Sequence, residues 1–147
     1  MHSLFTFLLL GFAPLALGNF WVFYEVDDND TYYTGYKFFN ESYPSCDEVG
    51  AAERWSLASD VSGGQRGVRV TGDDRTLPDV FEANVGTLHY TIYKDRGYGI
   101  FDTHGTQHGF CQSYNAIPYF CVDINWYGTS AFHCNSDYDA AQINVWL

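Results

Sequence analysis

The segment that decides the fold is Leu88-His89-Tyr90-Thr91-Ile92-Tyr93-Lys94-Asp95-Arg96-Gly97-Tyr98-Gly99-Ile100-Phe101. Apolar and polar side chains alternate over its first six residues, which is the period of a β-strand with one buried face. Asp95-Arg96-Gly97 has the composition of a tight turn, and residues 98–101 are again rich in strand-forming side chains. The segment therefore predicts an antiparallel β-hairpin.

Similar short aromatic and β-branched runs, separated by Gly, Asn, Asp and Pro, occur on both sides of this hairpin. They predict strands at residues 20–25, 32–39, 67–71, 80–85, 109–112, 120–126 and 131–134. The first two runs are apolar on both faces, so we expect them to be buried on two sides. The fold class is predicted to be mainly β, an antiparallel sandwich or barrel-like sheet with one short α-helix and two disulfides.

The one predicted helix covers residues 46–55. Ser45 is placed to cap it, and Glu48 follows three residues later, as in a capping box. Val49, Ala52 and Trp55 recur at a spacing of three and predict the buried stripe of this helix.

The N-terminus indicates secretion. Residues 4–13 are an apolar run, too short for a bilayer that requires roughly 20 apolar residues. Pro14 ends the run, and small residues precede Asn19, where cleavage is expected. We predict a signal peptide at 1–18, a single secreted β-rich domain at 19–147, an extracellular location and no membrane span.

The cysteines are even in number, as expected for disulfides in a secreted chain: Cys46, Cys111, Cys121 and Cys134. Three pairings are open, but Cys46 must join one of the three C-terminal cysteines if all four are paired. A zinc site is the alternative, but no Cys-x-x-Cys or His-x3-5-His pair combines with these cysteines at the spacing of a zinc finger. We expect no metal site.

Asn29 and Asn40 stand in Asn-x-Ser/Thr sequons and are candidate glycosylation sites.

The composition argues against several functional classes. The formal net charge is −11, with 7 Lys and Arg against 18 Asp and Glu, which opposes nonspecific binding to DNA. The sequence has no Gly-x-Ser-x-Gly, no His-Glu-x-x-His and no phosphate-binding glycine loop, so we expect no cofactor. We interpret the acidic residues 27–30 as a solvated turn, because their order is not that of a calcium loop.

Glu82 is the candidate for acid–base chemistry, together with His89 and His104 further along the chain. A facing carboxylate and imidazole can act as base and acid in RNA transesterification. The order of hairpin, helix, strand Glu82 and the segment 99–105 before Cys111 resembles the small fungal guanyl-specific ribonucleases. That resemblance implies Glu82 as the base and His104 as the acid. The family's Tyr-x-His-x-Tyr segment is missing, and no Arg follows Glu82 before the Asp95 turn to stabilise the phosphorane charge.

The mature chain also resembles uncharacterised small secreted fungal cysteine-containing proteins of the candidate-effector kind. The resemblance lies in residues 60–64, residues 89–98 and the cysteine-bearing C-terminal third. It implies a role directed at a host or a cell wall, without a known reaction.

The expected function is that of a noncatalytic secreted protein that binds a host or cell-wall partner, either an extracellular protein or a carbohydrate. Exposed aromatic side chains suit such a role because they combine apolar area with a polar tip. The candidates for partner binding are Tyr32, Tyr36, Trp126 and Tyr127. The alternative function is that of a ribonuclease-like endoribonuclease using Glu82 and His104.

Overall fold

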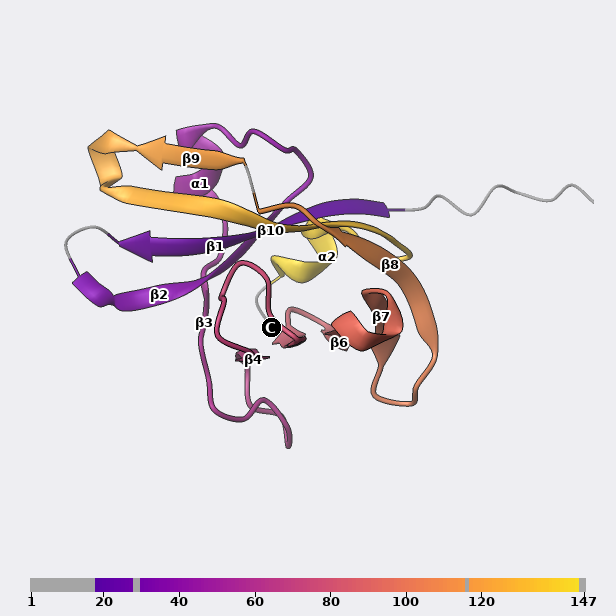
Figure 1. Ribbon diagram of the computed structural model, residues 1–147. Coiled ribbons are helices and arrows are strands. Elements are labelled where there is room, and N and C mark those ends of the chain that lie inside the picture. Colours follow the sequence, from indigo (N-terminus) through magenta and orange to yellow (C-terminus); the bar gives the residue numbers. More distant parts are fainter. Residues whose placement is uncertain (1–17, 28–29, 116, 146–147) are drawn as a thin grey trace, which may run out of the picture.

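The computed structural model describes residues 18–27, 30–115 and 117–145, and the predicted signal peptide lies outside them except for Gly18. This part of the chain is mainly antiparallel β-sheet with two short α-helices (Figure 1). The strands are β1 (Gly18–Asp27), β2 (Asp30–Phe39), β3 (Trp55–Ser56), β4 (Gly67–Thr71), β5 (Val80–Val85), β6 (Leu88–Tyr93), β7 (Gly99–Asp102), β8 (Gln107–Ser113), β9 (Pro118–Cys121) and β10 (Trp126–Ser136). The helices are α1 (Cys46–Ala51) and α2 (Ala140–Ile143).

The strands form one sheet that is nearly closed into a barrel. Their order is β3-β2-β1-β10-β8-β7-β6-β5-β4, and β9 pairs with β10 outside this path. The two ends of the sheet meet at a parallel bridge between Leu57 and Val68. The prediction of an antiparallel sandwich or barrel-like sheet is confirmed, and the sheet has the form of a nearly closed barrel.

The predicted hairpin is confirmed as β6 and β7. Tyr93 pairs with Gly99 across it, and a 3-10 turn at Lys94–Arg96 joins the strands. Gly97 closes this turn with a φ of 63°, a left-handed conformation that glycine adopts without steric cost.

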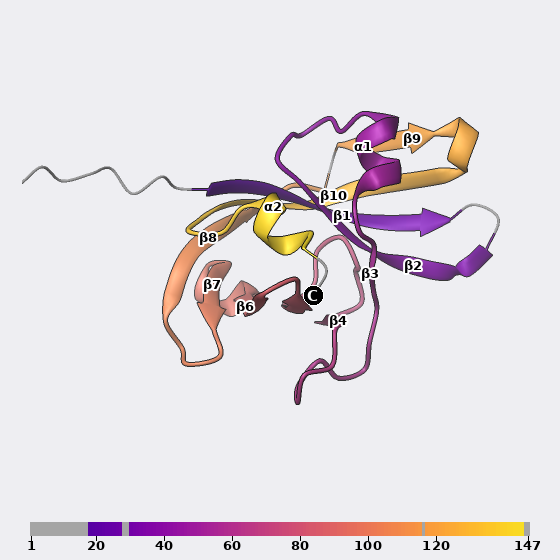
Figure 2. The ribbon, with the colours of Figure 1, turned by 180° about the vertical axis from the view of Figure 1, so that it is seen from behind.

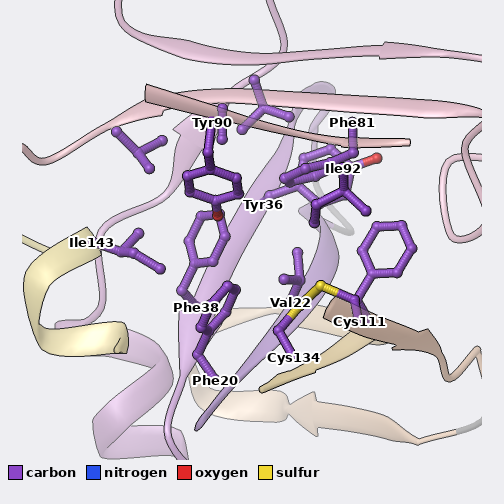
Figure 3. Packing of buried hydrophobic residues seen from close by; sticks show 14 of the residues in the cluster. Phe20, Val22, Tyr36, Phe38, Phe81, Tyr90, Ile92, Cys111, Cys134 and Ile143 are labelled. Carbon is purple, nitrogen blue, oxygen red and sulfur yellow. A yellow bond between two sulfur atoms is a disulfide. The ribbon is translucent and has the colours of Figure 1, made fainter. Parts of the chain in front are cut away.

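The hairpin of β1 and β2 is buried on both sides, as its two apolar faces predicted. Phe20, Val22 and Phe38 point into the barrel, where they join the main core with Phe81 from the opposite wall (Figure 3). Phe23 and its neighbours point outward into a second cluster with residues of α1 and β9. Strand alternation thus sends successive side chains of one hairpin into two different cores.

Helix α1 begins as predicted but is shorter. Ser45 and Glu48 form the expected capping box, and Val49 is buried. The helix ends at Ala51 because Ala52 is extended, with ψ of 140°, and Trp55 lies in β3 instead of on the helix. The prediction of a helix to residue 55 is therefore wrong for its last four residues.

The second helix, α2, was not predicted from the sequence. Its residues Ala140 and Ile143 are buried in the main core, where Ile143 is drawn beside the aromatic residues (Figure 3). The helix contacts β1 and β2, and it lies beside β1 in both views of the ribbon (Figure 1 and Figure 2). Neither helix of the described residues is long and apolar enough to cross a bilayer.

The predicted strand at 120–126 is wrong for residues 122–125. Strand β9 ends at Cys121, residues Val122–Ile124 form a 3-10 turn, and β10 begins at Trp126. Asn125 reverses the chain with a φ of 53°, a conformation that Asn adopts more readily than most residues. Apolar side chains recur at every second residue through this turn, so the sequence pattern gave no indication of it.

Candidate functional site

The candidate catalytic carboxylate, Glu82, lies in the middle of β5 on the outer face of the barrel. Its neighbours Phe81 and Ala83 point into the core, so strand alternation sends Glu82 outward. The cross-strand partner of Glu82 on β4 is Arg69, and its partner on β6 is Thr91. His89 lies two positions before Thr91, on the same face of β6. Three strands therefore bring the three ionisable side chains together.

Both oxygens of the Glu82 carboxylate are engaged. Nε and Nη2 of Arg69 lie 2.8 and 2.6 Å from Oε2, and Nε2 of His89 lies 3.0 Å from Oε1. The side chains are 17%, 35% and 26% exposed for Glu82, Arg69 and His89, respectively. We call these three residues the outer-face cluster. It holds a carboxylate, an imidazole and a fixed positive charge that solvent can reach.

His104 is not part of this cluster. It lies in the turn between β7 and β8 with an 86% exposed side chain, and its Nδ1 is 3.9 Å from Oδ2 of Asp102. No ion pair joins His104 to Glu82 in the part of the chain that the structure describes. The pairing of Glu82 with His89 was anticipated from the sequence, whereas its contact with Arg69 was not.

A second cluster surrounds His108 on β8. Its Nε2 lies 3.1 Å from Oδ2 of Asp102 and its Nδ1 lies 3.3 Å from Oδ2 of Asp137, while its ring stacks on Tyr138. Asp102 also accepts hydrogen bonds from backbone N–H groups of the adjoining turn. The hydrogen bond from His108 and these N–H groups lower the pKa of Asp102 to about 2. The cluster ties the β7–β8 turn to the segment before α2.

A third ionic cluster is fully buried beneath α1 and β9. Lys37 Nζ lies 3.3 Å from Oε2 of Glu25, and both side chains have no exposed area. Tyr119 donates a hydrogen bond of 2.5 Å to the same oxygen, and Lys37 donates to the carbonyl of Val49. Burial raises the pKa of Glu25 and lowers that of Lys37, because desolvation disfavours each charged form. Seclusion from solvent gives this cluster a structural role.

The four aromatic candidates for partner binding have different environments. Tyr36 is fully buried in the main core and its hydroxyl donates to the carbonyl of Arg75, so no partner can reach it in the folded protein. The ring of Trp126 is half-buried, with Lys37 Nζ 3.8 Å from its centroid. Tyr127 is 37% exposed. The side chain of Tyr32 lies outside the described part of the structure.

Tyr127 belongs to an exposed apolar surface at the end of the β9–β10 hairpin. Phe120 pairs with Tyr127 across the hairpin and is 59% exposed, and the turn adds Val122 at 66% and Ile124 at 38%. We call Phe120, Val122, Ile124 and Tyr127 the hairpin tip. The sequence did not indicate this exposed surface, because residues 120–126 were predicted to form one strand whose apolar face would point inward.

The cysteines form two disulfides, Cys46–Cys121 and Cys111–Cys134. The first joins α1 to the end of β9, beside the hairpin tip, and the second joins β8 to β10 inside the barrel (Figure 3). Among the described residues, no group of three or more His, Cys, Asp or Glu side chains is arranged to hold a metal ion. Asn40 is exposed just after β2, whereas Asn29 lies outside the described residues.

In comparisons of the chain with protein-family models, curated proteins and solved structures, no match was found.

Proposed function

We propose that the protein is a noncatalytic extracellular binding protein that contacts a protein partner through the hairpin tip. The observation that carries the proposal is the exposure of four neighbouring apolar side chains, Phe120, Val122, Ile124 and Tyr127. Large apolar side chains that are exposed close together in a fold commonly mark interaction sites.

The hairpin tip is held in place before any partner arrives. Cys121, between Phe120 and Val122, is bonded to Cys46 at the start of α1. Both ribbon views place α1 beside β9 (Figure 1 and Figure 2). A surface that is already ordered loses little conformational entropy on binding, which favours affinity.

The surroundings of the hairpin tip indicate the chemistry of the partner. Asp123 lies within the turn, and Asp47 is exposed on α1, whose Gly50 approaches Ile124. The whole chain carries a formal net charge of −11. A protein with an apolar pocket and a basic rim would bury the apolar side chains and pair with the acidic groups around them.

An extracellular location is part of the proposal. Both disulfides fit an oxidising compartment, since such bonds are rare in the cytosol of mesophiles. The apolar N-terminal run of the sequence supports secretion independently.

The test is selection of peptides from a random displayed library by the purified protein. We expect enrichment of peptides with aromatic or aliphatic residues next to Lys or Arg, and weaker binding at high salt. A double variant, Phe120→Ser with Val122→Ser, should lose this binding. Thr87→Ser should retain it, because Thr87 is exposed in the turn between β5 and β6, away from the hairpin tip in the strand order. Equal enrichment by the double variant would reject the hairpin tip as the contact surface.

A ribonuclease-like activity is the second candidate, and the outer-face cluster is the observation that favours it. The absence of an Arg between Glu82 and the Asp95 turn had suggested that the positive group was lost. Arg69, from the preceding strand, supplies a guanidinium in contact with Glu82. In this alternative Glu82 acts as the base, Arg69 stabilises the phosphorane charge, and a histidine acts as the acid.

An RNA-cleavage assay separates the two functions. The wild type is compared with Glu82→Gln, His89→Ala and His104→Ala, and Asp95→Asn serves as the matched exposed control. The binding proposal expects no cleavage above background in any of them. Robust cleavage by the wild type and Asp95→Asn that is lost in Glu82→Gln would establish the enzyme instead.

A further inference from the structure

A groove of about 260 Å³ opens between the end of β2 and the two helices. Its walls come from Phe39 of β2, from Ala51 of α1 and from Ala141 of α2, and Asn40 and Glu48 contribute polar groups. The alanine side chains are short, so the space between the helices is left open. The groove is thus apolar on most of its walls and polar at three residues, Asn40, Glu48 and Asn144.

Asn40 lines this groove and is also the acceptor residue of the sequon Asn40-Glu41-Ser42. It is exposed and follows directly after the last residue of β2. Phe39, the residue before it, is almost fully buried, so the backbone at the start of the sequon is fixed by the core. A group attached to Asn40 Nδ2 would start its path at the groove.

We propose that Asn40 carries an N-linked glycan whose first N-acetylglucosamine occupies this groove. This inference rests on the proposed extracellular location, because the modification requires passage through the secretory pathway. Transfer from a lipid-linked oligosaccharide diphosphate forms the bond between Nδ2 and C1 of the sugar. The lipid diphosphate leaves, and the amide loses one proton.

The groove matches an amino sugar in its chemistry. A pyranose ring has apolar C–H faces that can pack on Phe39, Ala51 and Ala141, and hydroxyl and acetamido groups at its edge that require hydrogen-bond partners. Glu48 uses Oε2 for the capping box with Ser45, and no hydrogen bond from the described residues reaches its Oε1. That oxygen is available to accept from the sugar.

The first measurement is the occupancy of Asn40. The full chain is expressed in a eukaryotic secretory host, and the secreted protein is analysed by intact mass and peptide mapping. We expect a glycan on Asn40 that is absent from Asn40→Gln and from Ser42→Ala, which keeps the asparagine. If the chain is not secreted, the proposed location fails, and occupancy is then measured with a heterologous leader placed before the full chain. A secreted protein with unmodified Asn40 would overturn the inference.

The second measurement tests whether the sugar occupies the groove. Glycans are trimmed enzymatically to one N-acetylglucosamine, and thermal unfolding is compared with that of Ser42→Ala. We expect the sugar to raise Tm by about 2–4 °C. The gain should vanish in Ala141→Gln, whose longer side chain fills the groove, and persist in Ser113→Gln, an exposed control on β8. An equal gain in both variants, or none in the wild type, would show that the sugar projects into solvent.

Discussion

Replacing Lys37 by Met removes the cation from the buried cluster and leaves the Glu25 carboxylate without it. Both side chains are fully buried, with Nζ 3.3 Å from Oε2. Met is close to Lys in length and fills the same space beside the ring of Trp126. The change therefore tests the charge more than the packing.

The expected loss in unfolding free energy is about 3–5 kcal/mol at neutral pH, the cost of leaving one partner of a buried ion pair uncompensated. Burial already raises the pKa of Glu25 above its ordinary 4.5, and Lys37 acts to lower it. Without Lys37 this pKa rises further. Below pH 4.5, a carboxyl whose folded-state pKa is raised is protonated in both the folded and the unfolded protein, so its burial carries no ionisation penalty there. Its contribution to the stability of the folded state is lost as the pH rises through the folded-state pKa. The deficit of Lys37→Met should therefore be smallest in acid and grow towards neutral pH.

The assay is urea unfolding followed by tryptophan fluorescence, at a pH below 4.5 and at neutral pH. Lys94→Met is the matched control, because Lys94 pairs with Asp79 on the surface and both are largely solvated. Its effect should be small, since exposed pairs contribute little. The double variant Glu25→Gln with Lys37→Met should recover much of the loss, because Gln still accepts from Tyr119. Lys37→Met that is no less stable than Lys94→Met, or whose deficit is the same at both pH values, would refute this reasoning.

Three further predictions concern stability. Thiol titration of the denatured protein should find no free cysteine, and reactive thiol in the wild type would contradict the pairing. The double variant Cys46→Ser with Cys121→Ser removes a disulfide that spans 75 residues, so it should lower the unfolding free energy by about 4 kcal/mol in the chain-entropy model. Gly50→Ala should stabilise α1 by up to about 1 kcal/mol, because a Cβ at that position meets only one atom, at 4.0 Å. Gly128→Ala should destabilise the protein, because its Cβ would lie 2.6 Å from the ring of Tyr119. Equal effects of the two substitutions in chemical unfolding would contradict this prediction. Asp102→Asn should flatten the acid side of the stability profile, because a carboxylate with pKa lowered from 3.8 to about 2 contributes stability above pH 3.8 that is lost as the pH falls through 2; an unchanged profile from pH 4 to 2 would count against it.

The local features of the fold could be predicted from the sequence because they depend on neighbouring residues. The β6–β7 hairpin follows from alternation and the turn at Asp95-Arg96-Gly97. The capping box follows from Ser45 and Glu48, three residues apart. The same local reasoning gave a wrong strand at 120–126, because alternation cannot register a reversal that depends on the left-handed conformation of Asn125.

The candidate site was predicted only in part for a related reason. Strand alternation places Glu82 and His89 on one face, and that much follows from residues seven positions apart. Arg69 is 13 positions away on β4, and it becomes the partner of Glu82 only through the register of β4 with β5. Tyr36 shows the converse, because it lies in a strand that is apolar on both faces, and only the tertiary structure shows that both faces are buried and that Tyr36 belongs to the main core.

The sequence by itself determined that this chain is a mainly antiparallel β-domain with one capped helix and cysteines suited to two disulfides. Those properties arise from side-chain period, turn composition and residue counts, which are local or additive. The tertiary structure alone decided that Cys46 pairs with Cys121, that Arg69 meets Glu82, and that the hairpin tip and the groove beside Asn40 are open. Each of these depends on strand order and register between distant segments, and the free energy that selects them comes from packing the whole core.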